Sequence, residues 1–413
     1  MTEGFQLSVL LYNLGKQAGI IGFVCLSLLI ISGDTARFFD RYFGLDKIIK
    51  FQRKFSLITA FFIVFHPLFF VLSDSSIATY LIPNFAVIPL ALGAISFYIF
   101  IVVMIASHFY KRISCIMWQY IHILTYVLFF LALYHGFNLG SDSNSIYIKT
   151  LYAVLVFGVI GGAIYRIQYK IRKKYVGRFY VKKIRRETKD TFSLILTAPK
   201  KFSFKAGQFC FLRLDKNKLH ARHPFTMSSS PHERNICFTI KNTGRFTKTA
   251  INLKAGEEVI VDGPFGIFAL KDNGKDSVFI AGGVGITPFF SMIKDNLFKE
   301  KKRDILLIYG SKTKEDIIFK DTLNNIKKGW FKKIYVLSHE TTSASGEYER
   351  GYINKDLINK YVKNIKNSSY YICGPEAMKI SIKKALFNLG VKKQNIVIEN
   401  FFYFAFTFVQ TFT

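Results

Sequence analysis

The chain is 413 residues long, half of it is hydrophobic, and it contains 44 Phe. This composition is too apolar for intrinsic disorder and too irregular for a fibrous repeat. Lys and Arg number 57 against 27 Asp and Glu, a net charge of +30. The five Cys form no CxxC pair, which disfavours a disulfide scaffold, a zinc ribbon and a Cys-ligated iron–sulfur cluster. Because the apolar residues are concentrated in the first 165 positions, a wholly soluble protein is also excluded.

Five long uncharged stretches lie in this first part of the chain. They cover residues 17–33, 55–72, 81–107, 113–141 and 150–165. A membrane helix needs about 20 mostly apolar residues, and each stretch meets this length, the last one when it is extended across Lys149. A cleaved signal peptide is the alternative for the first stretch, but the acidic Glu3 lies near the start of the chain and no basic n-region precedes the apolar run. We predict a five-span membrane helical bundle over residues 1–170.

The loops between the stretches indicate how the bundle is oriented. Basic residues gather between the first two stretches, in residues 108–112 and after the last stretch, whereas residues 73–80 and 136–146 contain no Lys or Arg. The positive-inside rule then places the N-terminus outside and the C-terminal half in the cytoplasm, across a bacterial-type inner or plasma membrane. The remaining positive charge suits anionic lipid, and no nucleic-acid-binding motif accompanies it.

Beyond about residue 170 the sequence becomes charged and alternating, with regular glycines. Short alternating stretches predict a β-barrel over residues 171–272. Strands that alternate with helical stretches predict an α/β domain with a parallel sheet over residues 273–401. Residues 402–413 form an aromatic extension that is too short to span a membrane as a helix.

Three histidines lie inside the predicted spans. His66 is in the second span, and His122 and His135 are in the fourth. The predicted topology puts His66 and His135 toward the outer leaflet, while His122, a rise of roughly 20 Å away, lies near the cytoplasmic one. Thirteen residues do not return an ideal helix to the same face, and polar residues that join helices by hydrogen bonds are the alternative. Neutral imidazoles are nevertheless suitable axial ligands for haem iron.

The run Trp118-Gln-Tyr-Ile-His122, the later His135 and the motif Phe65-His66-Pro67 resemble the membrane domain of the ferric reductase and NADPH oxidase family. The resemblance implies two stacked b-type haems, with His66 and His135 as ligands of the outer one and His122 as one ligand of the inner one.

Two features depart from that pattern. The position of the second inner ligand is Gln52, which is a poor haem ligand. The inner haem is then five-coordinate, or another group such as His108 replaces the ligand, or only the outer haem is bound; we favour one haem. In addition, residues 17–54 resemble the second helix of the family, so the usual first helix of six is not expected.

The predicted barrel contains Arg222-His-Pro-Phe-Thr-Met-Ser-Ser-Ser230, which resembles the FAD signature of ferredoxin-reductase-like proteins. A hairpin with a Pro turn is the alternative. The resemblance implies that His223 contacts the FAD phosphates, that Phe225, after Pro224, packs on the ring system, and that the Thr226 hydroxyl reaches the flavin N5 edge. Further along, Lys241, Gly244 and Thr247 offer the groups that bind a pyrophosphate.

A buried stretch then runs into the glycine-rich turn Gly282-Gly283-Val-Gly285-Ile-Thr287-Pro288, and Pro288 favours the start of a helix. Such a turn lets backbone N–H groups approach phosphate oxygens at a helix N-terminus. About 85 residues later, Cys373-Gly374-Pro375 resembles the turn that lies beside the nicotinamide in the same family. By this resemblance Thr226 and Cys373 flank the path of hydride transfer.

The last two predictions concern the choice between NADPH and NADH and the role of the C-terminal residues. Ser311 and Lys312 lie where the family reads the ribose 2′ position, which favours NADPH over NADH. The related oxidases end near Glu-Asn-Phe, and the resemblance implies that Phe401 covers the flavin.

Taken together, these features predict a membrane flavohaem oxidoreductase that passes electrons from cytoplasmic NAD(P)H through FAD and haem b to an acceptor outside, either a ferric or cupric chelate or O2. One alternative is a membrane-anchored NAD(P)H:flavin or quinone reductase with a degenerate haem domain. The other is a non-enzymatic membrane scaffold, against which the complete set of flavin and nucleotide motifs argues.

Overall fold

The computed structural model describes residues 3–74, 76–109, 112–140, 142–171, 176–197, 202–214, 222–299, 302–340 and 348–400. The chain divides into two compact units, and the division falls between residues 172 and 173. The aromatic extension at 402–413 lies outside the described residues.

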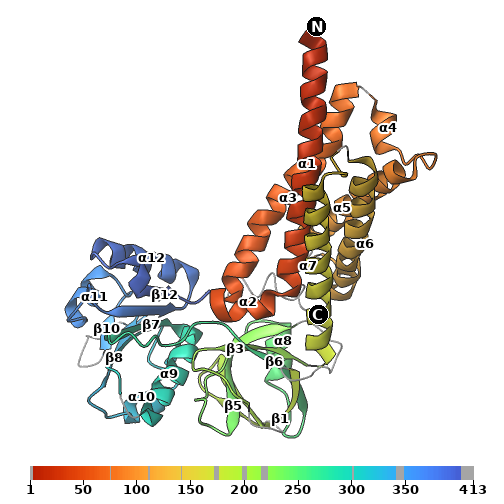
Figure 1. Cartoon of the computed structure of the whole chain (residues 1–413). Coiled ribbons are helices and arrows are strands. Elements are labelled where there is room, and N and C mark those ends of the chain that lie inside the picture. Colours follow the sequence, from red (N-terminus) through yellow and green to blue (C-terminus); the bar gives the residue numbers. More distant parts are fainter. Residues whose placement is uncertain are drawn as a thin grey trace. The chain divides into compact units, whose positions relative to one another are not determined.

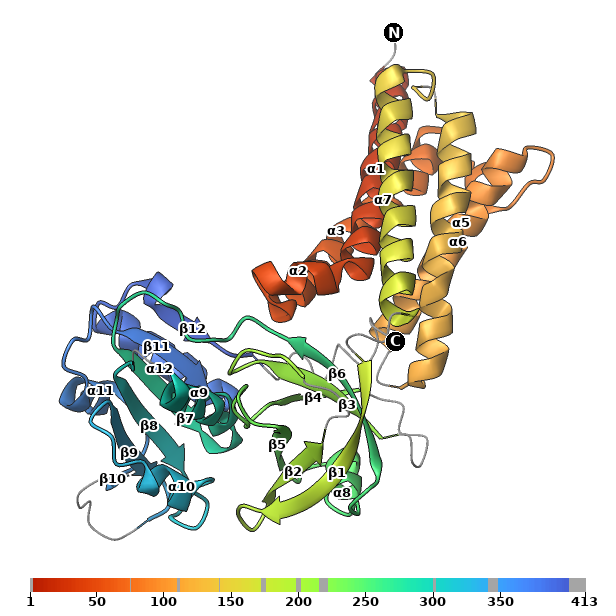
Figure 2. The ribbon, with the colours of Figure 1, turned by 60° about the horizontal axis from the view of Figure 1, so that its bottom comes forward.

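The first unit is a helical bundle. Its helices are α1 (Glu3–Asp34), α2 (Ala36–Phe43), α3 (Leu45–Asp74), α4 (Ile77–Leu81), α5 (Ile88–His108), α6 (Cys115–Leu139) and α7 (Ile146–Ile171). Five of these, α1, α3, α5, α6 and α7, are long and apolar enough to cross a membrane, which confirms the predicted spans. Figures 1 and 2 show α1 beside α3 and α5 beside α6, and the closest packing in the bundle is within these two pairs.

The observed helix ends differ from the predicted stretches for local reasons. Helices α1 and α3 extend well beyond the uncharged residues, because charge at a helix end does not prevent helix formation. Gly44, with φ of +79°, separates α2 from α3 in the left-handed conformation that favours glycine. Helix α5 begins at residue 88 instead of 81, with Pro at its start. The Ser114 hydroxyl caps α6 by accepting from the Met117 N–H at 3.1 Å.

The second unit opens with a six-stranded antiparallel sheet. Its strands are β1 (Val176–Arg186), β2 (Thr191–Thr197), β3 (Phe209–Arg213), β4 (His223–Thr226), β5 (Asn235–Lys241) and β6 (Glu258–Phe265), in the order β4-β3-β6-β1-β2-β5, with the short helix α8 (Arg245–Ala250) after β5. Alternate side chains pack into one core that includes Phe192, Leu194 and Phe238. The alternating sequence predicts strands at residues 178–184, 192–197, 208–213, 236–242 and 258–262, which match the other five strands. It does not predict β4, which carries the flavin motif.

A parallel sheet follows, in the order β10-β9-β8-β7-β11-β12. Its strands are β7 (Ser277–Gly282), β8 (Ile305–Ser311), β9 (Phe331–Leu337), β10 (Tyr348–Arg350), β11 (Ser369–Cys373) and β12 (Ile396–Ile398). The helices are α9 (Thr287–Phe298), α10 (Lys320–Asn325), α11 (Lys355–Tyr361) and α12 (Glu376–Asn388), with 3₁₀ turns η2 (Gly283–Ile286) and η3 (Lys393–Asn395). Successive side chains on each strand face opposite sides, so α9 and α10 share one core with the sheet, and α11 and α12 share another.

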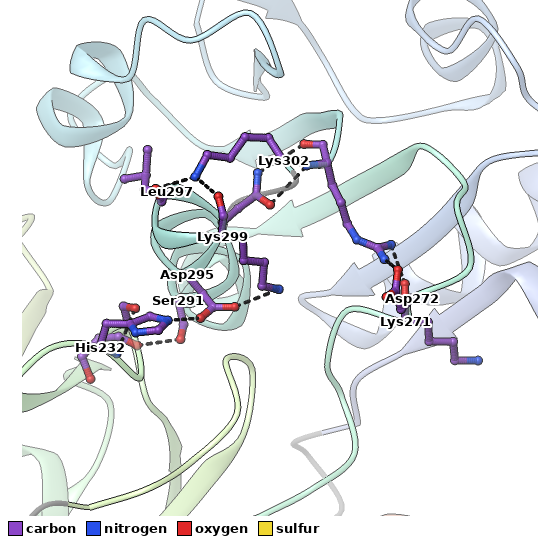
Figure 3. Close-up of polar contacts among 12 residues, drawn as sticks. His232, Lys271, Asp272, Ser291, Asp295, Leu297, Lys299 and Lys302 are labelled. Carbon is purple, nitrogen blue, oxygen red and sulfur yellow. Dashed lines mark hydrogen bonds and ion pairs between the residues drawn. The ribbon is translucent and has the colours of Figure 1, made fainter.

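Helix α9 joins the two sheets of the second unit, as Figure 3 shows. Ser291 on α9 donates to the Ser229 carbonyl at 2.6 Å, and Asp295 accepts from His232 at 3.2 Å. The C-terminal end of α9 is fixed by Lys302, which donates to the carbonyls of Leu297 and Lys299. The loop that follows the flavin motif and the helix that follows the glycine-rich turn are therefore held together.

Candidate functional site

His66 and His135 face each other inside the helical bundle. Their ring centroids are 6.0 Å apart and the ring planes meet at 81°. His66 Nδ1 lies 2.8 Å from the Gly15 carbonyl, and His135 Nδ1 lies 2.9 Å from the Pro89 carbonyl. Because a carbonyl oxygen can only accept, each Nδ1 carries the proton and each Nε2 keeps its lone pair. Metal-binding histidines are oriented in this way, by a backbone carbonyl at the second ring nitrogen.

Glycines on the neighbouring helices make room for both rings. A Cβ added at Gly19 would lie 2.7 Å from the His66 ring, and one added at Gly93 would lie 2.3 Å from His135 Nδ1. Both glycines and both histidines line one cavity of about 370 Å³, whose other walls are mainly aliphatic and aromatic. The sequence prediction missed these glycines, although Gly15 and Gly19 form a small-xxx-small pattern that is typical of close helix packing.

A haem fits this arrangement better than a bare metal ion does. Among the described residues, no group of three or more His, Cys, Asp or Glu side chains is placed to hold a metal. Two imidazoles leave a tetrahedral ion incompletely bound, whereas His66 and His135 would suffice as the protein ligands of a haem.

The third histidine has different surroundings. His122 stacks on Trp118 one turn earlier in α6, with centroids 3.5 Å apart, and neither His122 Nδ1 nor Trp118 Nε1 has a hydrogen-bond partner among the described residues. Gln52, at the position expected for a second inner ligand, donates to the Ser32 hydroxyl at 3.2 Å. His108, the suggested substitute, is the last residue of α5 and is exposed. Among the residues that the structure describes, His122 is not paired with another histidine.

A buried polar network lies one turn after His122, and the sequence prediction missed it. Tyr126 donates to Asp34 at 2.8 Å, and Arg166 forms an ion pair with the same carboxylate at 3.1 Å. The Asp34 side chain is only 2% exposed. The network joins the end of α1 to the middle of α6 and the last turns of α7. An acidic residue at the end of an otherwise apolar span was the available signal, because such residues seek partners.

In the second unit, the flavin motif forms the edge strand β4 and meets helix α8. Phe225 stacks on Phe246 with centroids 5.6 Å apart, and His223 lies 4.2 Å from the same ring. Burial lowers the pKa of His223 to about 4, so its imidazole is neutral at pH 7. Arg222 forms an ion pair with Asp262 at 2.5 Å and fixes the start of the strand. Phe246 and Arg222 were not among the predicted site residues.

The other residues predicted to bind FAD lie in strand β4 or in contacts within the same domain. Pro224 and Thr226 pair with β3, and Thr226 is buried. Lys241 is bound to Asp190 at 2.9 Å. The Thr247 hydroxyl caps α8 by accepting from the Gly244 N–H at 2.9 Å. These contacts commit Lys241 and Thr247 to local structure, so the pyrophosphate role predicted for them stays a prediction.

The glycine-rich turn and the Cys-Gly-Pro turn meet at the carboxyl edge of the parallel sheet. Ala281 pairs with Cys373 on neighbouring strands. A Cβ at Gly285 would lie 2.4 Å from the Cys373 carbonyl, and one at Gly374 would lie 3.0 Å from the Gly282 N. Gly283 has φ of +54°. Strand order reverses between β7 and β11, which is the crevice where open α/β sheets bind nucleotides.

The remaining predicted nucleotide residues surround this edge. Thr287 and Pro288 begin α9 and are buried. Ser311 ends β8, beside β7, and Lys312 follows it. Cys373 is 1% exposed, and burial raises the pKa of its thiol well above the usual value. Phe401 lies outside the described residues.

Comparison with known proteins fits this division of the chain. Family models match for a ferric reductase like transmembrane component over residues 18–133, a FAD-binding domain over 177–269 and an oxidoreductase NAD-binding domain over 279–384. The chain has the architecture of the ferric reductase and NADPH oxidase family. It therefore combines an integral membrane component with a FAD-binding and an NAD-binding domain. The first match includes His66 and His122, and His135 lies two residues beyond it.

Individual relatives share parts of this architecture. Flavohemoprotein A of Dictyostelium discoideum is 29% identical over 199 residues, which are 45% of this chain and 48% of that protein. One component of the Na(+)-translocating NADH-quinone reductase of Haemophilus ducreyi is 29% identical over 200 residues, which are 44% of this chain and 49% of that component. The chain spans about half the length of these relatives.

Two solved structures resemble the fold. The Amycolatopsis cytochrome P450 reductase GcoB has a TM-score of 0.50 and 24% identity, and the match covers 55% of this chain and 69% of that one. The flavohemoglobin of Malassezia yamatoensis, solved with bound FAD and heme, has a TM-score of 0.52 and 17% identity, and the match covers 97% of this chain and 99% of that one. At such identities the likeness shows the fold alone.

Proposed function

We propose that this oxidoreductase moves electrons from NAD(P)H through FAD and one haem b to an acceptor on the opposite side of the membrane. The observation that carries the proposal is the His66 and His135 pair, whose Nδ1 atoms are both bound to backbone carbonyls beside a shared cavity. Two such imidazoles suit an iron that is already held by a porphyrin.

Each part of the chain has a distinct task in this proposal. FAD, when bound, accepts a hydride, which is two electrons and a proton, and can release the electrons singly; haem iron accepts one electron at a time. The described residues bind and orient these groups. The glycine-rich turn offers backbone N–H groups to a phosphate. Phe225 of β4, which stacks on the buried Phe246, offers an aromatic surface, and His66 and His135 offer two Nε2 lone pairs.

Orientation and acceptor are part of the proposal. The basic loops place the N-terminus outside and the second unit in the cytoplasm of a bacterial-type membrane. The described segments that connect α3 to α5 and α6 to α7 are short, so they suit a small acceptor, such as a ferric or cupric chelate or O2 with formation of superoxide. Lys312 favours NADPH, because a lysine near the ribose suits a 2′-phosphate.

A second candidate rests on the surroundings of His122. Trp118 covers a face of that imidazole and Gln52 is bound to Ser32, so the chain could instead be a membrane-anchored flavin or quinone reductase without haem. The test is electron transfer in sealed vesicles that contain the purified chain, with NADPH outside the vesicles and a ferric chelate inside. Chelate reduction that requires bound haem supports the proposal, whereas NADPH oxidation by a haem-free chain supports the alternative.

A further inference from the structure

Lys379, in the first turn of α12, is a buried cation to which the proposed function gives no role. Its side chain is only 2% exposed. Burial of an ammonium is costly, and the first turn of a helix adds to the cost because the helix dipole is positive there. A cation kept in such a place needs compensating contacts.

Those contacts come from two separate parts of the chain. Lys379 Nζ lies 2.7 Å from Glu376 Oε2 in the same helical turn. It also donates to the Glu399 carbonyl at 3.3 Å and to Asn400 Oδ1 at 3.1 Å, both just after β12. An ammonium has three protons, and each has an acceptor here. Lys379 therefore ties the end of β12 to the start of α12.

This tie lies beside the Cys-Gly-Pro turn. Residue 375 of that turn is the N-cap of α12, and Glu399 donates its N–H to the carbonyl of Ile372 at 3.0 Å, next to Cys373. Burial and the nearby charge of Glu399 raise the pKa of the Cys373 thiol, and the charge of Lys379 opposes them. Both charged groups therefore act at the edge of the sheet where the two glycine-containing turns meet.

We propose that Lys379 is a positioning residue of the nucleotide site, and that it fixes the Glu399–Asn400 segment beside Cys373 so that the nicotinamide is held correctly toward the flavin. The inference rests on the part of the proposed function in which NAD(P)H reduces bound FAD. In this proposal the buried Lys379 controls the rate of hydride transfer and not the affinity for the nucleotide.

The test uses the full-length chain, purified in detergent with FAD bound. Lys379→Met keeps the length and removes the charge, and Lys384→Met, on the exposed face of the same helix, is the matched control. The measurements are the rate of flavin reduction at saturating NADPH, the dissociation constant of NADP+, and amide hydrogen exchange at residues 399 and 400 in the nucleotide-free chain.

We expect Lys379→Met to slow flavin reduction by on the order of tenfold, because small misplacements of reacting groups have effects of this size or more. Amide exchange at residues 399 and 400 is expected to speed up, while the dissociation constant of NADP+ stays within about twofold of that of the unsubstituted chain. Lys379→Arg, which keeps the charge and donors, is expected to recover most of the rate, and Lys384→Met is expected to change nothing.

Several outcomes would overturn the inference. These are unchanged exchange at residues 399 and 400, an unchanged rate of flavin reduction, or a slower rate that weaker NADP+ binding explains fully. If Lys379→Met does not retain FAD, Asn400→Leu removes a single acceptor and is judged by the same criteria. A chain without substitutions that cannot reduce FAD with either nucleotide would contradict the proposed function itself, which is a separate result.

Discussion

His66 and His135 lie in the same helical bundle as His122, but their surroundings differ from those of His122. The first two have their Nδ1 atoms bound to backbone carbonyls, face glycines and line a shared cavity. His122, by contrast, interacts with the backbone and the ring of Trp118, one turn earlier in its own helix. Under the proposed function, the comparison teaches that the space and the orienting groups around a histidine matter for haem binding as much as the histidine itself.

The largest effect is expected from removal of either member of the pair. His66→Ala or His135→Ala leaves a single imidazole, so haem is expected to be lost and electron transfer across the membrane to stop. Reduction of FAD by NADPH should persist, because its residues lie in the second unit. The measurements are haem content and vesicle-enclosed chelate reduction, with the exposed His108→Ala as control. If the chelate inside the vesicles is still reduced in both variants, electrons do not pass through a haem held by His66 and His135.

Gly93→Ala tests whether space beside the ring matters. The new methyl would lie 2.3 Å from His135 Nδ1, so the imidazole must move, at a cost of about 1–3 kcal/mol for overpacking. We expect a several-fold lower haem content after purification. Gly161→Ala in α7 is the matched control, since a Cβ there meets no atom within 4 Å. Equal haem retention in the two variants would show that the cavity does not depend on Gly93.

Asp34→Asn tests the part of the bundle near His122. The substitution removes the carboxylate that Arg166 contacts. Because Arg166 is partly exposed, the cost lies between the roughly 0–1 kcal/mol of an exposed ion pair and the roughly 3–5 kcal/mol of a buried one. The melting temperature of the chain is therefore expected to fall, while haem bound between His66 and His135 is retained. A thermal melt followed by haem absorbance measures both. Loss of haem without loss of stability would mean that the network serves the haem site directly.

His223 extends the comparison to a histidine of the second unit. Its folded-state pKa of about 4 lies below the ordinary 6.5, so the unfolded chain binds the proton more readily. This contribution to stability is present above about pH 6.5 and is lost as the pH falls toward 4, by about 2 kcal/mol after allowance for partial exposure. FAD release on heating should therefore occur at a lower temperature at about pH 5 than at pH 7. In His223→Gln this pH dependence should be weaker; an equal dependence would refute the assignment.

The smallest effect is expected for His122→Ala. If this residue does not bind haem, the haem content and its visible spectrum should match those of the unsubstituted chain. A pyridine haemochrome assay on both preparations measures this. A loss of about half of the haem would mean that a second haem is bound at His122.

The sequence predicted the elements that have a local signal. Five apolar stretches and three intramembrane histidines stand out because charge and polarity are rare in a membrane span. The glycine-rich and Cys-Gly-Pro turns stand out because their backbone conformation or close approach requires glycine. Their meeting at one sheet edge follows from parallel strand order.

The features that it missed depend on contacts across long sequence separations. Gly93 matters because it faces His135, 42 residues later, and the Asp34 network joins residues that are 92 and 132 positions apart. Strand β4 is four residues long and contains a proline, which lowers the strand signal. Such features depend on which helices and strands pack against each other, and no local pattern in a single sequence indicates this.

The central claim is that His66 and His135 hold one haem, and the most direct test is the ratio of haem to FAD in the purified full-length chain. A pyridine haemochrome assay, combined with release of FAD, gives this ratio. The account predicts about one haem for each FAD. Bound FAD without any haem would contradict it and would leave a membrane-anchored flavin reductase.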